Sequence, residues 1–285
     1  MNAEELAAVT EALKPWRQGD AVVGPQTFTH YADLAKPISQ PAAFAAAEAI
    51  AEGDPLAIES IDTTERGLVV LTQTCDLIRP PNQRPYVEVA PLVEVQPAVL
   101  NEIRKRKRPN FVFIPSLAHE RLVGDLDRTM TVEKSIVAGW DRVTGCLSSA
   151  EQADFARALA RKRARYAFPD EFGEVFRNFR DHTKDQRKKA TLEGQHVEAL
   201  AEIRVSADPD WDTPKAGLTY YFIVEDGELE NEALDWPTQV EAWANKLIPD
   251  GWAFGAAVAV DLSTINAKTY VESAAVDTDD FSPDA

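Results

Sequence analysis

Residues 86–95 read YVEVAPLVEV, a stretch in which apolar and polar side chains alternate. A period of two residues is typical of a β-strand with one buried face. Upstream, residues 67–73 form the nearly continuous apolar run GLVVLTQ, which predicts a strand buried on both faces. Further strands are predicted at 16–23, 56–61 and 110–114. Five short strands within about 120 residues predict a small β-barrel.

Helices are predicted before, within and after this barrel. Residues 3–14 carry apolar side chains at helical spacing, and the alanine-rich residues 38–53 predict a helical insertion between the first two strands. Residues 149–165 and 170–202 are helical in composition and rich in basic side chains.

From residue 203 the chain changes to strand-like segments. These are EIRVSAD, LTYYFIVED, FGAAVAVDLS and TYVESAAVD, with a helix predicted at 237–247 between the second and third. The order predicts a small antiparallel sheet with a helix on one face, and so an α+β fold overall. The expected divisions are 1–148 (N-terminal helix and barrel), 149–202 (basic helical segment), 203–276 (small α+β domain) and 277–285 (mobile acidic tail).

Charge is distributed unevenly along the 285 residues. The net charge is −17, yet residues 100–190 contain 20 Lys and Arg against 13 Asp and Glu. Within this basic region lies the run Arg104, Lys105, Arg106, Lys107 and Arg108. Such a run is typical either of a solvated loop or of a loop that contacts nucleic-acid phosphates.

Several classes of protein are disfavoured by what the sequence contains. The longest apolar windows fall short of the roughly 18 residues of a membrane span, and the N-terminus is acidic where a signal peptide is basic, so we expect a cytoplasmic protein. Cys75 and Cys146 are expected to be reduced thiols, and the four histidines have no zinc-finger spacing. Signatures of phosphate loops, zinc proteases and serine hydrolases are missing, and we expect neither metal nor cofactor.

The most distinctive local motif is LVVLTQTCDLIRP at residues 68–80, where a buried strand leads directly into polar side chains. Cys75 is a candidate nucleophile if a base such as His119 approaches it in the fold. Alternatively, Cys75 fills the core while Thr74 and Asp76 bond to backbone groups of a turn.

A second motif, VGDLDRTMTVEKSIVAGW, occupies residues 123–140. Its charged side chains Asp125, Asp127, Glu133 and Lys134 are candidate acid/base groups. The alternative is that these side chains, interleaved with Arg128, form ion pairs that fix a turn and a helix start.

Taken in succession, four segments resemble the MazF/PemK family, the barrel ribonucleases of toxin–antitoxin pairs. They are RQGDAVV, ERGLVVLTQ, YVEVAPL and GDLDRTMTVEKSIV, and the similarity covers about residues 16–140. The resemblance implies a small Src-homology-3-like barrel and a homodimer.

The same resemblance assigns the family's catalytic arginine to Arg66, which would stabilise charge on a scissile phosphate. Gly67 replaces the family's usual proline, and the catalytic hydroxyl position falls at Leu92 or Val93. A principal catalytic hydroxyl is therefore missing.

We therefore expect a non-catalytic or weakly catalytic component of a bacterial toxin–antitoxin or phage-defence system, which binds RNA and a protein partner. One alternative is an active endoribonuclease that uses Arg66 with Asp76 or Thr74 as acid/base, and another is a Cys75-dependent enzyme. The acidic C-terminal region either confers solubility or covers the basic segment.

Overall fold

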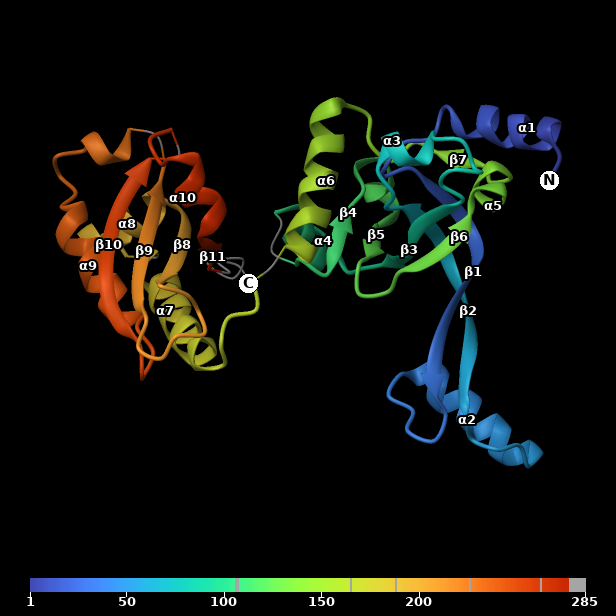
Figure 1. Cartoon of the computed structure of the whole chain (residues 1–285), viewed down its shortest axis with the longest axis horizontal. Coiled ribbons are helices and arrows are strands. Elements are labelled where there is room, and N and C mark those ends of the chain that lie inside the picture. The colour runs from blue at the N-terminus through green and yellow to red at the C-terminus, as the bar shows by residue number, and fades with distance from the viewer. Residues whose placement is uncertain (106–107, 165, 188, 226, 262, 277–285) are drawn as a thin grey trace. The chain divides into compact units, whose positions relative to one another are not determined.

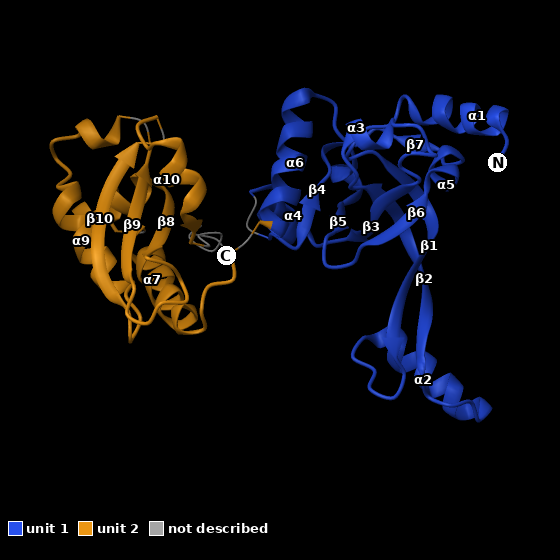
Figure 2. Cartoon of the chain, in the orientation of Figure 1, with its two compact units in different colours: residues 1–163 blue, residues 164–285 orange. Residues whose placement is uncertain are grey.

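The computed structural model describes all residues except 106–107, 165, 188, 226, 262 and 277–285 (Figure 1). The chain is a mixed α+β protein that divides into two compact units, Met1–Arg163 and Ala164–Ala285 (Figure 2). The predicted tail at 277–285, together with Arg106 and Lys107, lies outside the described residues. Within the described part of the chain, every helix is too short or too polar to cross a bilayer.

Unit 1 contains a curled antiparallel sheet, seen in Figure 1 as a half-barrel. Its strands are β1 (Ala21–Asp33), β2 (Ile58–Val70), β3 (Tyr86–Glu94), β4 (Phe111–Phe113), β5 (Leu122–Asp125), β6 (Met130–Glu133) and β7 (Arg142–Val143). The strand order is β4-β5-β3-β2-β1-β7, and β6 also pairs with β3. The strand predicted from the alternation at 86–95 is confirmed as β3, which lies at the centre of this sheet.

Two strand predictions in unit 1 need correction. The strands expected at 56–61 and 67–73 are one strand, β2, because it pairs with β1 along almost its full length. The strand expected at 16–23 begins only at Ala21. The residues before it form a turn, in which Trp16 is buried.

Some of the helices of unit 1 cover the two faces of the sheet. The helices of this unit are α1 (Ala3–Leu13), α2 (Gln40–Glu52), α3 (Thr74–Leu77), α4 (Pro97–Arg104), η1 (Pro115–Glu120), α5 (Lys134–Ala138) and α6 (Ser149–Arg163). Val69 packs with Phe155 of α6, whereas its neighbours Leu68 and Val70 pack with Leu13 of α1 and with α5. The predicted burial of this strand on both faces is therefore confirmed.

The predicted insertion at 38–53 is confirmed as α2, which lies between β1 and β2. Ser39 caps its first turn by accepting a hydrogen bond from the Ala42 N–H, and Gly53 ends it in the left-handed conformation. The residues around α2 and the outer parts of β1 and β2 extend away from the rest of the sheet (Figure 1).

Unit 2 has helices packed on a four-stranded sheet of order β10-β9-β8-β11. Its elements are α7 (Glu171–Arg187), α8 (Leu192–Ala199), β8 (Leu200–Asp208), β9 (Gly217–Val224), η2 (Glu228–Glu230), α9 (Trp236–Lys246), β10 (Ala253–Asp261), α10 (Ala267–Glu272) and β11 (Ala274–Ala275). Tyr220 and Phe222 of β9 belong to the buried core that α7, α8 and α9 complete.

The prediction of a purely antiparallel C-terminal sheet is wrong, because β10 runs parallel to β9. The connection between them contains α9, and a helical crossover of this length returns the chain in the same direction. The strand expected in TYVESAAVD is mostly α10, followed by the two residues of β11. The helical segment expected at 149–202 is shared, with α6 in unit 1 and α7 and α8 in unit 2.

Candidate nucleic-acid interface

A cavity of about 500 Å³ lies in unit 1 between α4, β4, η1 and α6. Its lining residues are Ile103, Arg104, Arg108, Pro109, Phe111, Val112, Phe113, Pro115, Ala118, Glu151, Asp154, Phe155, Ala158 and Arg161. The cavity thus combines apolar and aromatic walls with three guanidinium groups.

The local sequence explains how the cavity forms. Pro97 occupies the first turn of α4, and Ile103 near its other end is buried, which fixes the point where the basic run begins. In β4, Val112 points into the core while its neighbours Phe111 and Phe113 are only half-buried. Because adjacent strand residues point to opposite faces, both phenylalanines lie away from the core and line the cavity, to which Val112 also contributes.

The acidic side chains around the cavity have partners of their own. Glu102 accepts a hydrogen bond from the Arg108 Nε at 2.6 Å. Glu151 accepts from the backbone N–H groups of Leu147 and Ser148 at the start of α6, and Asp154 pairs with Arg157. Glu151 therefore holds the start of α6, Asp154 pairs within the same helix, and Glu102 offsets part of the Arg108 charge.

Part of the predicted basic run reaches this cavity. Arg104 and Arg108 line it, whereas Lys105 is exposed at the end of α4 and does not belong to the lining. Arg161 was missed by the sequence reasoning. It could have been found from α6 alone, since Asp154, Ala158 and Arg161 recur at helical spacing on one face.

Arg66, the predicted catalytic arginine, is near the inner end of β2, and its side chain is 60% exposed. Its Nη1 lies 3.1 Å from Oε2 of Glu94, a carboxylate that Arg121 also binds. These hydrogen bonds and charges, Arg121 first and then Arg66, hold the pKa of Glu94 below its ordinary value. At the position of the family's hydroxyl, the Leu92 side chain is fully buried.

Thr74, Cys75 and Asp76 lie together on the short helix α3. The Thr74 Oγ1 accepts a hydrogen bond from the Gln18 N–H at 3.0 Å, and the Asp76 carboxylate lies 3.6 Å from the Arg79 Nε. Thr74 therefore bonds a backbone group, as predicted, but one of the loop before β1 and not of its own turn, and the prediction that the Asp76 side chain bonds backbone groups is wrong because it pairs with Arg79. Among the described residues, no hydrogen bond or ion pair joins these side chains to Arg66.

Cys75 is exposed, so the interpretation that it fills the core is wrong. The helix buries Leu77 there and leaves Cys75 on its outer side. The Cys75 sulfur lies 3.7 Å from the Gln73 Oε1, and His119 instead contacts the Ser116 carbonyl and Glu120. No histidine of the described chain is hydrogen-bonded to this thiol.

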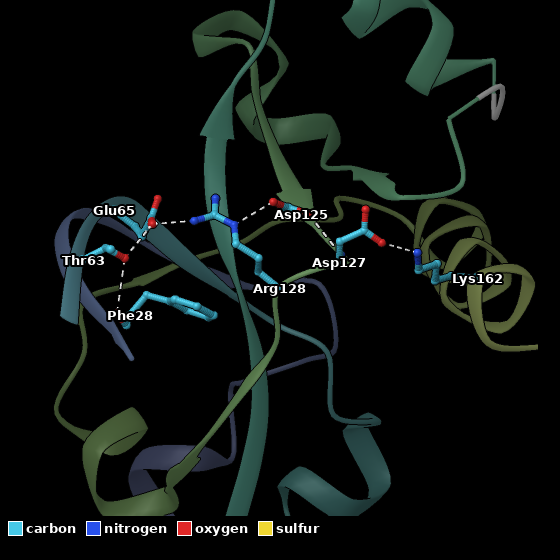
Figure 3. A network of polar contacts seen from close by, with 7 residues as sticks. All are labelled: Phe28, Thr63, Glu65, Asp125, Asp127, Arg128 and Lys162. Atoms are coloured by element: carbon cyan, nitrogen blue, oxygen red, sulfur yellow. Dashed lines mark hydrogen bonds and ion pairs between the residues drawn. The ribbon is translucent and has the colours of Figure 1, made fainter. Parts of the chain in front are cut away.

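The second motif forms a polar network centred on Arg128 (Figure 3). Its guanidinium donates to Glu65 Oε1 at 2.7 Å and to Asp125 Oδ2 at 2.8 Å. Asp127 lies beside Asp125 and pairs with Lys162 of α6. The prediction of ion pairs around a turn is therefore confirmed for Asp125 and Asp127, whereas Glu133 and Lys134 form none among the described residues.

Lys134 is buried, and its ammonium donates to the backbone carbonyls of Asp76 and Arg79 at 2.8 and 2.6 Å. Burial lowers its pKa. Lys134 joins the start of α5 to the end of α3, whereas Glu133 is exposed near Ser135.

Among the residues that the structure describes, no group of three or more His, Cys, Asp and Glu side chains is arranged to hold a metal ion. Comparison with known proteins gave no matching family model, no similar curated protein and no similar solved structure.

Proposed function

We propose that unit 1 is a Src-homology-3-like barrel of the MazF/PemK type that binds single-stranded RNA and cleaves it weakly or not at all. In this proposal the chain is a component of a bacterial toxin–antitoxin or phage-defence system. The single observation that carries it is the cavity, in which Arg104, Arg108 and Arg161 border Phe111 and Phe113.

The chemistry of these side chains favours RNA. Guanidinium groups bind phosphate oxygens through paired N–H donors, and aromatic rings stack on bases regardless of their identity. A volume of about 500 Å³ lies within the range of small-ligand sites, so it suits one splayed nucleotide of a single strand.

The surroundings of Arg66 support binding more than catalysis. A phosphate that approached Arg66 would compete with Glu94, which already accepts from Arg66 and Arg121, just as a phosphate at Arg108 would compete with Glu102. The buried Leu92 supplies no proton donor or acceptor beside it.

Fluorescence anisotropy of a 5′-labelled, mixed-sequence single-stranded RNA tests the binding site. The double variant Arg104→Gln/Arg108→Gln is expected to weaken binding about tenfold or more at low salt, and to reduce the slope of log affinity against log salt by about 1.4. Arg84→Gln is the matched control, because Arg84 is exposed in the loop before β3 and does not line the cavity. If the control and the double variant lose the same RNA affinity, or if neither loses any, the cavity is not the RNA-binding site.

Gel electrophoresis of the same RNA over time distinguishes the enzymatic alternatives. The exposure of Arg66 and of Cys75 keeps each accessible to a substrate. Cleavage that disappears in Arg66→Ala would replace the binding proposal with an endoribonuclease. Cleavage that disappears only in Cys75→Ala would assign the chemistry to the thiol.

A further inference from the structure

Residues 29–62, here called the arm, comprise the outer parts of β1 and β2 and the helix α2 between them (Figure 1). In the sheet, β1 pairs with β7 only at Ala21 and Val22, and β2 pairs with β3 only from residue 68 onward. The arm strands therefore pair only with each other among the described residues. A two-stranded ribbon has little stability of its own in water.

The arm buries few apolar groups and exposes many. Its own core is Leu34, Ala46 and Ile61, supported by small alanine side chains. The large apolar side chains that it exposes are Tyr31, Ile38, Phe44, Ile50, Leu56 and Ile58. So many large apolar side chains exposed on one short segment are typical of a surface that another molecule covers.

The helix α2 concentrates this surface. Ala42 and Ala46 face the ribbon, while Phe44 and Ile50 are 67% and 65% exposed. Apart from its polar ends and Glu48, the helix is apolar, and large apolar side chains on a helix normally face a core or a partner. We therefore expect the outer side of α2 to be covered in the working protein.

Charge indicates what covers it. The arm contains one basic residue, Lys36, against six acidic ones: Asp33, Glu48, Glu52, Asp54, Glu59 and Asp62. Two arms with a net charge of −5 each repel one another, so the charge disfavours an arm-to-arm contact. The complementary surface is an apolar site bordered by arginines.

This chain carries such a site in the α4–β4–α6 cavity. We propose that the arm of one copy docks into this cavity of a second copy, head to tail. Phe44 would contact Phe111 and Phe113, while Glu48 and Glu52, one and two turns further along the Phe44 side of α2, would face the Arg104 and Arg108 guanidiniums.

A contact of this kind joins two different surfaces, so each copy can bind a neighbour on both sides. Heterologous contacts build rings or open chains rather than a single closed dimer. The acidic arm would also exclude RNA from the cavity, which makes RNA binding weaker as the protein concentration rises.

Sedimentation analysis of the full chain without RNA tests the docking, using three variants. Phe44→Ser/Ile50→Ser removes the arm surface, Arg104→Glu/Arg108→Glu reverses the cavity charge, and Ile136→Ser replaces an exposed apolar side chain outside both. Circular dichroism confirms that each variant is folded, which the exposure of the changed side chains favours.

The wild type and Ile136→Ser are expected to exceed one chain mass of 31.5 kDa as concentration rises at low salt, and to return to it at high salt. The arm variant and the cavity variant should each remain monomeric alone. Mixed in equal amounts, they should form a species of two chains, because one retains the cavity and the other the arm.

A wild type that stays monomeric at low salt would overturn the docking. Self-association of either double variant alone would overturn it as well, and so would a mixture that stays monomeric while the wild type associates. Because RNA is absent, these results are independent of whether the cavity binds RNA.

Discussion

At position 67 the backbone conformation excludes the residue that the MazF/PemK resemblance implies. Gly67 has φ +149°, and a Cβ there would lie 2.2 Å from the Val22 carbonyl oxygen. Proline fixes φ near −65° and cannot adopt this conformation. Gly67 faces Val23 across the β1–β2 pair, so the glycine next to Arg66 is required by the close approach of these two strands. The sequence showed the departure from the family pattern, but its cause lay in a contact more than 40 residues away.

Replacing Gly67 by alanine is expected to lower the free energy of unfolding by about 3 kcal/mol, because a strained φ and a backbone clash are both introduced. Urea unfolding followed by circular dichroism measures the change. Gly24→Ala is the matched control, since Gly24 also has a positive φ of +115° but has open space around its Cβ position. A loss no larger than that of the control would contradict the steric argument.

The two thiols are expected to differ sharply in reactivity. Burial, and then the negative charges of Glu151 and Asp20, raise the pKa of Cys146 to about 11, whereas Cys75 is exposed. A thiol reagent at pH 8 should modify one cysteine in the native protein and a second only after unfolding. In Cys75→Ser the native protein should be unreactive, and rapid labelling of that variant would show that Cys146 is accessible.

Elements differed in how far their sequence determined them. The alternation in β3 and the caps of α2 are local signals, so both were predictable. The apolar residues of β10 could not predict its direction, because the side-chain periodicity is the same in parallel and antiparallel strands. The helix α9 between β9 and β10 was the feature from which a parallel pair could have been predicted. The candidate site could also be predicted only in part. The basic run is evident in the sequence, but Arg104 and Arg108 meet α6 only because Phe155 and Leu159 of that helix pack in the core.

Arg128 joins β2 to the turn between β5 and β6, through Glu65 and Asp125, and variants of this ion-pair network measure how much the link contributes to stability. Arg128→Met should cost about 2 kcal/mol of unfolding free energy, because the Glu65 and Asp125 carboxylates are only 13% and 15% exposed and lose their cation. Lys162→Met should cost less than about 0.5 kcal/mol, since its partner Asp127 is half exposed. Urea unfolding measures both changes. Equal costs would show that the burial of the two carboxylates contributes little.

At the scale of the whole molecule, the two units differ strongly in net charge. Residues 164–285 contain 11 Lys and Arg against 25 Asp and Glu, while residues 1–163 contain 19 against 22. The net charge of −17 therefore resides mostly in unit 2 and says little about whether unit 1 can bind an anion. Each unit also has its own hydrophobic core, formed by described residues of that unit.

Separate cores predict that 1–163 and 164–285 each fold alone, with a cooperative urea transition for each fragment. The fragment 1–163 should then bind single-stranded RNA more tightly than the full chain at low salt, because the −14 of unit 2 no longer repels the phosphates. If that advantage vanishes at high salt, unit 2 acts only through long-range charge. If it persists, and if added 164–285 competes with RNA, then unit 2 occupies the RNA surface directly. Weaker binding by 1–163 than by the full chain would contradict the assignment of RNA binding to unit 1 alone, since unit 2 would then contribute to the interface.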